Sequence, residues 1–138
     1  MLFRSGGFTT GRAWRPFSAG RAQANVEWQA DSPSSLLSLY RRLIHLRASS
    51  PALRNGSMAV LDAGEGNRQL LAFVREAGGE RVLVVHNLGL TAVTAGPWDL
   101  HASEAKLLYA TSGGAKARAK GDTRITIPAA CSAIWRLK

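Results

Sequence analysis

The feature that most constrains the fold is a change of hydrophobic period near Gly56. Downstream of this residue, apolar side chains alternate with polar ones or form short runs bounded by glycine and proline. About seven such runs follow, at 57–63, 68–76, 80–88, 91–95, 105–112, 123–128 and 132–138. Short strands at regular spacing, separated by turn residues, are typical of an antiparallel sandwich or barrel. Residues 56–138 are therefore predicted to form a β-domain, in which the run 80–88 is apolar enough to be covered on both faces.

One amphipathic helix is predicted before the strands, over about residues 32–48. Asp31 or Ser32 is the expected N-cap, and Pro33 suits the first turn because the N–H that it lacks would be unbonded there. Pro51 disfavours helical backbone at the preceding residue, so the helix should end just before it. The apolar side chains recur at three- and four-residue spacing: Leu36, Leu39, Tyr40, Leu43, Ile44 and Leu46. A face this wide is expected to pack on a large surface.

The segment 6–29 has no helix or strand period, yet it contains large aromatic side chains. These are Phe8, Trp14, Phe17 and Trp28. Side chains of this size in irregular backbone usually have a surface to pack against, because burying one is worth roughly 1.5–3 kcal/mol. The predicted fold class is therefore mainly β with an N-terminal helix. Residues 1–55 form the irregular segment and helix, and residues 56–138 form an antiparallel β-sandwich.

Composition narrows the range of partners. The formal net charge is +9 and the pI is about 11.1, but the arginines are spread along the chain, and the basic run 116–124 is predicted to be a loop. Nucleic-acid binders usually join clustered charge to a recognisable module or stacking aromatics, so no nucleic-acid partner is predicted. No apolar run approaches the roughly 18 residues of a membrane span, and no membrane partner is predicted. Cys131 stands alone, which excludes an internal disulfide and favours a reducing compartment, the cytoplasm.

The sequence contains no recognisable catalytic constellation. Its nine carboxylates fall mostly in predicted turns or at strand ends, and Asp62 and Glu65 flank one turn without a spacing that demands a shared proton. His45, His86 and His101 are far apart in sequence and are interpreted as structural. The paired-cysteine spacing of zinc sites and the glycine-lysine ending of phosphate loops are both absent. No catalytic residue, cofactor or metal ligand is therefore predicted.

Two stretches, "GGFTTGRAWRPF" (6–17) and "NVEWQADSPSSLLSLYRRLIHLRASSPALRNG" (25–56), resemble the late part of alpha-amylase superfamily enzymes. The resemblance is to the branch of oligo-1,6-glucosidases, alpha-glucosidases and trehalose synthases. The positions that carry it are Gly7 to Gly11, Trp14, Pro16, Asn25 to Glu27, Gln29, Asp31, Leu36, Leu37, Tyr40 to Ile44, Leu46, Arg47, Pro51 to Leu53 and Gly56. The later runs "LLAFVRE", "RVLVVHNL" and "SAIWRL" are similar to strands of that family's C-terminal β-domain.

This resemblance implies a place within a larger enzyme. The opening segment would follow the last strand of a (β/α)8 catalytic barrel, the helix would be the barrel's final helix, and the strands would form a Greek-key domain behind it. Phe8, Trp14 and Trp28 would then contact the barrel or a bound sugar. Such enzymes use a retaining mechanism whose carboxylates lie upstream of the matched region. The chain is thus expected to be a fragment, cut near Met1, that is inactive alone and supports a barrel outside it.

Two other functions stay open at the level of sequence. A free-standing carbohydrate-binding module would use Trp98 or Trp135 to stack on an alpha-glucan, although the alternating pattern around Trp135 favours core packing. An interaction module would instead self-associate through residues 1–50, because large exposed apolar surfaces tend to find partners.

Overall fold

The computed structural model describes residues 11–22 and 24–138. Contacts divide the chain into two compact units, Met1–Ile44 and His45–Lys138, and each is described by itself. The second unit includes residues 45–55, which precede the strands. The reason is that Leu46, Ala52 and Leu53 pack in one cluster with residues of the strands.

In the first unit, local hydrogen bonds hold two short helical turns and the start of a longer helix. The 3-10 turn η1 (Ala19–Ala22) is followed by α1 (Val26–Ala30), and α2 (Leu36–Ser49) comes next. Asn25 caps α1, because its Oδ1 accepts a hydrogen bond from the backbone N of Trp28 at 2.8 Å. The motif residue Asn25 thus has a structural role in fixing where α1 begins.

The start of α2 differs from the prediction. The helix begins at Leu36 rather than at residue 32, and Asp31 is the C-cap of α1. Ser35 takes the N-cap role instead, because its Oγ accepts a hydrogen bond from the backbone N of Ser38 at 3.2 Å. The proline expected in the first helical turn therefore lies in the connection between the helices. The sequence pattern missed this connection because α1 is too short to show a period.

The second unit contains a further helix that the hydrophobic pattern does not predict. As predicted, α2 ends at Ser49, but Pro51 then begins α3 (Pro51–Asn55). Ser50 is the N-cap of α3, and its Oγ accepts a hydrogen bond from the backbone N of Leu53 at 3.1 Å. Pro51 can both end α2 and begin α3. Proline disfavours helical backbone at the residue before it, and the N–H that it lacks would be unbonded in the first turn of a helix.

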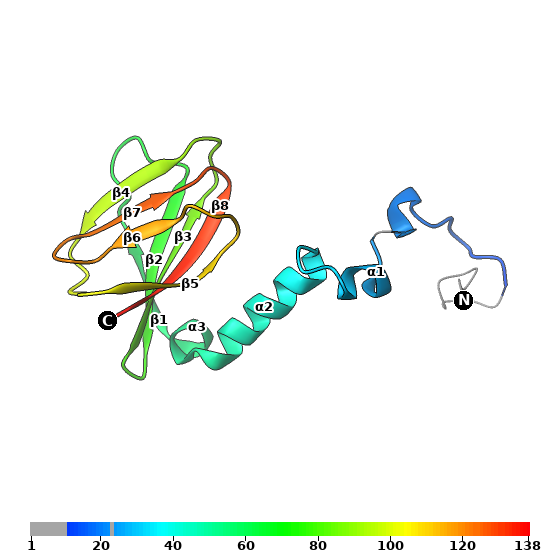
Figure 1. Cartoon of the computed structure of the whole chain (residues 1–138), viewed down its shortest axis with the longest axis horizontal. Coiled ribbons are helices and arrows are strands. Elements are labelled where there is room, and N and C mark those ends of the chain that lie inside the picture. Colours follow the sequence, from blue (N-terminus) through cyan, green and yellow to red (C-terminus); the bar gives the residue numbers. More distant parts are fainter. Residues whose placement is uncertain (1–10, 23) are drawn as a thin grey trace. The chain divides into compact units, whose positions relative to one another are not determined.

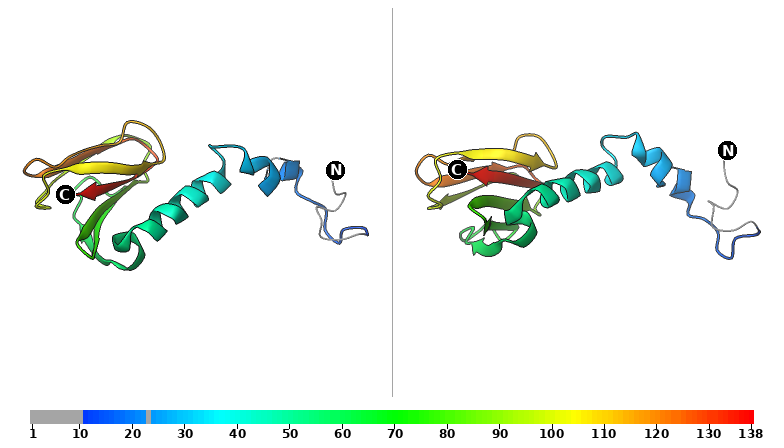
Figure 2. Two further views of the ribbon diagram at one scale, coloured as in Figure 1. Left: turned by 60° about the horizontal axis from the view of Figure 1, so that its bottom comes forward. Right: turned by 90° about the horizontal axis from the view of Figure 1, so that it is seen from below.

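The remainder of the second unit is a sandwich of two antiparallel sheets (Figures 1 and 2). The strands are β1 (Ser57–Leu61), β2 (Leu70–Ala77), β3 (Glu80–Asn87), β4 (Val93–Trp98), β5 (Ala105–Ala110), β6 (Lys116–Arg118), β7 (Thr123–Ile127) and β8 (Cys131–Leu137). The larger sheet has the order β1-β2-β3-β8-β5, and the smaller one has the order β4-β7-β6. The predicted antiparallel sandwich is confirmed.

Strand β6 corrects the prediction of a loop over the basic run. Ala115, Ala117 and Ala119 alternate with longer side chains and pack toward the core between the sheets. The period of two that marks a strand was therefore present in the sequence. It was obscured because the inward residues are small and the outward residues are charged.

Alternate residues of both sheets build the core. Leu83 and Val85 of β3, Trp135 of β8, and Ile125 and Ile127 of β7 belong to one cluster, and each is at most 1% exposed. This packing follows the strand period, because every second side chain points to the same face of a sheet.

Burial of Trp98 and Trp135 contradicts the sugar-stacking role considered for them. Trp98 is 8% exposed and Trp135 is 1% exposed, so neither offers a ring face to a ligand. The indole N–H of Trp98 donates to the carbonyl oxygen of Asp62 at 2.6 Å. Cys131 is also buried, as expected for a small residue in a strand.

Strand β3 is covered on its other face as well. Val82 and Val84 form a second buried cluster with Ala52 and Leu53 of α3, and Leu46 packs against this cluster. The prediction that the run 80–88 is covered on both faces is confirmed. The helix α3 therefore closes part of the outer face of the five-stranded sheet.

Gly56 connects α3 to β1 at a close backbone approach. A Cβ atom at this position would meet the carbonyl oxygen of Ala52 and, at 2.9 Å, that of Glu76. Both contacts are with backbone, which cannot rotate away as a side chain can. A glycine is therefore required here for space, although its backbone angles (φ −65°, ψ 154°) are open to other residues.

We expect Gly56→Ala to lower the free energy of unfolding by about 1–3 kcal/mol, because the added methyl group overpacks a site that has no room. Gly113→Ala is the matched control, since a Cβ there meets nothing within 4 Å. Urea denaturation followed by tryptophan fluorescence would measure both. Equal unfolding midpoints for the two variants would contradict the steric explanation.

Candidate functional site

Two of the aromatic residues singled out by the sequence, Trp14 and Trp28, are exposed in the part of the chain that the structure describes. Phe8 lies outside the described residues. The side chain of Trp14 is 90% exposed, and that of Trp28 is 54% exposed. The guanidinium of Arg15 lies 5.3 Å from the centroid of the Trp14 ring, within the range of a cation–π contact. Exposed rings of this size are candidates for contact with a partner.

Acidic and histidine side chains are held in separate local interactions. Across residues 11–22 and 24–138, no group of three or more His, Cys, Asp or Glu side chains could hold a metal ion. Several carboxylates bond to a nearby base or backbone N–H: Asp62 to Gly64 N, Glu76 to Arg81, Asp99 to His101, and Glu104 to Lys138. These interactions stabilise turns and strand ends, and they bring no pair of acids together for proton transfer.

His86 is the histidine with the most structured surroundings. Its Nδ1 lies 2.8 Å from the hydroxyl Oγ of Ser132, and its ring centroid is 6.0 Å from that of Phe73. Burial lowers the pKa of His86, because a buried site disfavours the charged imidazolium. This supports the structural role predicted for His86. By contrast, His45 and His101 are exposed.

We call the second unit, His45–Lys138, the β-unit. Two hollows of about 510 Å³ each indent its surface, and neither resembles a sugar site. The polar residues that line the first are Asp62, Asn67 and Arg68. The second is lined by Asp99, His101, Ala102, Ser103, Lys120, Gly121 and Asp122. Neither lining contains a Trp, Tyr or Phe side chain, although pockets of this size are usually lined by apolar and aromatic residues.

The first unit exposes a line of large apolar side chains on α2. We call Leu36, Tyr40 and Ile44 the α2 stripe. They recur at every fourth residue, which places them one above another on a helix face, and they are 61%, 59% and 61% exposed. The apolar face predicted from the sequence is therefore present, and this part of it is uncovered.

The second unit exposes another apolar surface on its five-stranded sheet. Val60 of β1 pairs with Phe73 of β2, and Phe73 pairs with Val84 of β3, so these three side chains lie on one face of the sheet. This is the outer face, which α3 covers in part. Met58, Val60 and Leu71 lie on this face and are 63%, 64% and 43% exposed. We call these three residues the β1–β2 patch.

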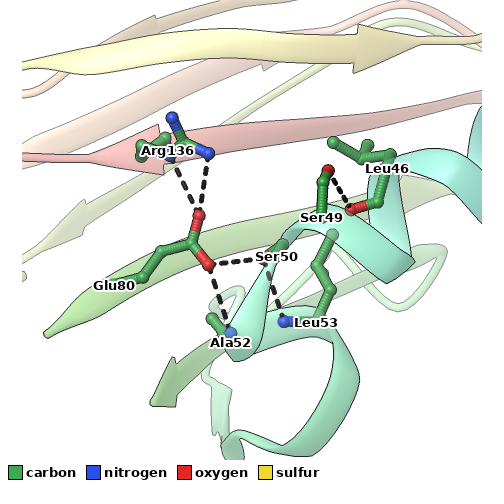
Figure 3. A network of polar contacts seen from close by, with 7 residues as sticks. All are labelled: Leu46, Ser49, Ser50, Ala52, Leu53, Glu80 and Arg136. Carbon is green, nitrogen blue, oxygen red and sulfur yellow. Dashed lines mark hydrogen bonds and ion pairs between the residues drawn. The ribbon is translucent and has the colours of Figure 1, made fainter. Parts of the chain in front are cut away.

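A carboxylate that the sequence analysis did not single out, Glu80, joins α3 to the sheet (Figure 3). Its Oε2 accepts hydrogen bonds from the Ser50 hydroxyl at 2.6 Å and from the backbone N of Ala52 at 3.2 Å. Its Oε1 accepts from Arg136 of β8 at 3.0 Å (Nε) and 2.9 Å (Nη2). The side chain is only 13% exposed, so these charge-assisted bonds compensate for its lost hydration.

The environment of Glu80 favours its charged form. Burial by itself would raise the pKa of Glu80, but the hydrogen bonds from Ser50, Ala52 and Arg136, together with the charge of Arg136, hold that pKa below its ordinary value. The sequence offered no signal for this role, because Ser50 and Arg136 are far from Glu80 along the chain.

The C-terminal end of α3 is held by two arginines. The guanidinium of Arg75 donates to the carbonyl oxygens of Leu53 and Gly56 at 2.9 and 2.7 Å. That of Arg47 donates to Leu53 at 2.7 Å and to Arg54 at 3.3 Å. Cations at the last turn satisfy carbonyls that a helix leaves unbonded. With Glu80 at its start, α3 is fixed to the β-unit at both ends.

Comparisons with known proteins agree on one region of one family. Residues 70–134 match the family described as "Alpha-amylase SusG C-terminal domain". The chain is 34% identical over 89 residues to a "Probable alpha-glucosidase" of Rhizobium meliloti (strain 1021), covering 64% of this chain and 16% of the relative. It is 31% identical over 103 residues to the "Oligo-1,6-glucosidase" of Bacillus cereus, covering 74% of this chain and 18% of the relative.

A solved structure extends the similarity over the whole chain. The trehalulose synthase MutB from Pseudomonas mesoacidophila MX-45 is similar with a TM-score of 0.77 and 29% sequence identity. The similarity covers 100% of this chain and 24% of that enzyme. The chain therefore spans less than a quarter of the length of these relatives. Among the described residues, no helix is long and apolar enough to cross a membrane.

We expect Glu80→Gln to lower the free energy of unfolding at pH 7 by about 1–3 kcal/mol, because it removes the charge that Ser50, Ala52 and Arg136 all recognise. The matched control is Glu65→Gln, which changes an exposed acid in a turn. Thermal unfolding at pH 7 compares the two variants with the parent chain.

The same carboxylate sets an expected pH dependence. Because the pKa of Glu80 is lower in the folded chain than in the unfolded one, its contribution to stability is present above the unfolded value and is lost as the pH falls through the folded value. The difference in stability between the parent chain and Glu80→Gln should therefore shrink on acidification. A difference that is constant from pH 7 down to about pH 3 would contradict this linkage.

Proposed function

Because this chain carries the C-terminal region of the alpha-amylase superfamily, we propose that it is a non-catalytic portion whose task is to support a catalytic barrel. The barrel would be supplied by residues outside this sequence. The proposal rests chiefly on one observation, the α2 stripe. Three large apolar side chains in one line are left uncovered on a helix that the family resemblance identifies as the barrel's last.

The size of the hydrophobic effect explains why such a surface calls for a partner. Covering one large apolar side chain is worth roughly 1.5–3 kcal/mol, so the stripe alone offers several kcal/mol to a surface that fits it. The β1–β2 patch supports the same proposal independently, since it continues the outer face of the sheet beyond the part that α3 covers. Both surfaces have the apolar character of an interface between parts of one protein.

The chemistry would then belong to the barrel. A retaining glycosidase needs two carboxyl groups about 5–5.5 Å apart on either side of the scissile bond. The carboxylates Glu76, Glu80 and Glu104 are instead engaged by arginine or lysine. The relatives named alpha-glucosidase and oligo-1,6-glucosidase support the proposal that the complete enzyme acts on alpha-glucosides. A cytoplasmic location is proposed from the single free thiol of Cys131.

A chimera tests the supporting role. The chain would replace the matching region of the trehalulose synthase MutB, whose fold it shares. We expect a soluble chimera. Replacing Leu36, Tyr40 and Ile44 with Gln should lower its free energy of unfolding by about 2 kcal/mol per side chain, and so lower its thermal midpoint. The measurements are soluble yield and thermal unfolding of the purified chimera.

The control separates loss of the interface from loss of the helix. Replacing Arg41, His45 and Ala48 with Gln changes as many exposed positions of α2 outside the stripe. Gln suits a helix at all six positions, so a difference between the two triple variants reports on the stripe. Equal stability of the two chimeras would show that the stripe is not covered, and the supporting role would then be abandoned.

We also expect the chain to self-associate when it is produced by itself, because the α2 stripe is then exposed to water. Sedimentation velocity over a range of concentrations would detect this association. The stripe variant described above should sediment as a monomer, whereas the control variant should associate as the parent chain does. A monomeric parent chain at every concentration would contradict the prediction.

A further inference from the structure

We propose that the outer face of the three-stranded sheet is a docking surface for an acidic protein partner. This basic face consists of Lys116 and Arg118 of β6 and Arg124 of β7, and all three side chains are exposed. The face lies across the sandwich from the sheet that α3 covers, because Ile125 and Ile127 point from the same strands into the core. The proposal therefore does not rest on the proposed function.

Strand pairing gathers these charges into one surface. Arg118 pairs directly with Arg124, and Lys116 pairs with Thr126, which pairs in turn with Thr94. Residues opposite one another in antiparallel strands share a face, with their Cβ atoms about 4.5–5.5 Å apart. The hydroxyls of Thr94 and Thr126 are hydrogen-bonded at 3.2 Å. The surface thus combines three cations with two hydroxyl groups.

The arrangement is unfavourable for the chain by itself. Like charges at directly opposite positions destabilise a sheet, and Arg118 and Arg124 occupy such positions. Over the range that the structure describes, the ion pairs are Arg81–Glu76, His101–Asp99, Arg136–Glu80 and Lys138–Glu104. The basic face takes part in none of them. An external anion placed between the two guanidinium groups would convert their repulsion into attraction.

Protection of the sheet edge explains only part of this surface. Strand β6 lies at the edge of its sheet, where charged side chains discourage pairing with another molecule. Strand β7 is the central strand, so the same reason does not apply to Arg124. The charge on the central strand therefore points to a partner that the face recognises.

The geometry favours carboxylates on a protein over a nucleic acid. Neither of the two hollows described above is lined by the three basic residues, which lie instead on the exposed face of a sheet. The paired residues of the face are threonines and basic residues, which give bases no aromatic ring to stack on. Three cations also fall short of the roughly six to ten phosphate contacts of a typical DNA-binding surface. A small set of exposed charges suits electrostatic selection of a protein partner.

The test uses the full chain and a fluorescent poly-L-glutamate peptide, with binding measured by anisotropy at low salt and in about 0.3 M NaCl. We expect the double variant Arg118→Gln and Arg124→Gln to weaken binding roughly three- to tenfold at low salt. The control variant, Arg54→Gln and Arg68→Gln, removes the same charge from exposed positions elsewhere in the β-unit. It should change the Kd by less than about twofold.

Thermal unfolding distinguishes lost recognition from lost structure. Removing two like charges that face one another should leave the unfolding midpoint of the double variant unchanged or higher. Equal weakening of peptide binding in both double variants would overturn the proposal, because net charge alone would then explain it. So would a short DNA duplex that competes more strongly than poly-L-glutamate and depends on the same two arginines. Binding that is unaffected by salt would overturn it as well.

Discussion

The β-unit depends on the burial of β3 on both of its faces. Leu83 and Val85 point into the core between the sheets, and Val82 and Val84 point to the side where α3 packs. The strand is also central in its sheet, between β2 and β8, so its backbone groups are paired on both edges. A strand surrounded in this way cannot shift its register without moving one apolar set into the wrong layer. The positions of α3 and of the smaller sheet both follow from this burial of β3 on its two faces.

Residues 50–56, several of which carry the family resemblance, have identifiable physical roles. Ser50 caps α3 and donates to Glu80, Pro51 begins the helix, Ala52 and Leu53 cover β3, and Gly56 leaves room for the backbone of β2. The helix is too short to be stable alone, because helices of this length are unstable in water without tertiary contacts. It persists because Glu80 holds its first turn and two arginines hold its last. These residues therefore attach α3 to the five-stranded sheet.

In the described part of the chain, carboxylates stabilise the fold, and the large uncovered surfaces are apolar and carry no catalytic group. Carboxylates are used to stabilise turns, strand ends and α3, while the large uncovered surfaces are apolar on α2 and on β1 and β2. An arrangement of this kind is suited to holding other protein surfaces in place. The chain's similarity to less than a quarter of the length of MutB agrees with the proposal that it is a supporting part of a larger enzyme.

The sequence by itself determined the sandwich, the end of α2 and the burial of the run 80–88 on both faces, because a hydrophobic period is a local property of the chain. It also carried the family resemblance, through residues at fixed spacing. Only the tertiary structure decided the partners of Glu80, the burial of Trp98 and the joining of Arg118 and Arg124 on one face. Each of these depends on which distant segments meet. No local pattern contains that information, because side-chain partners such as Glu80 and Arg136 are brought together only when the strands pair.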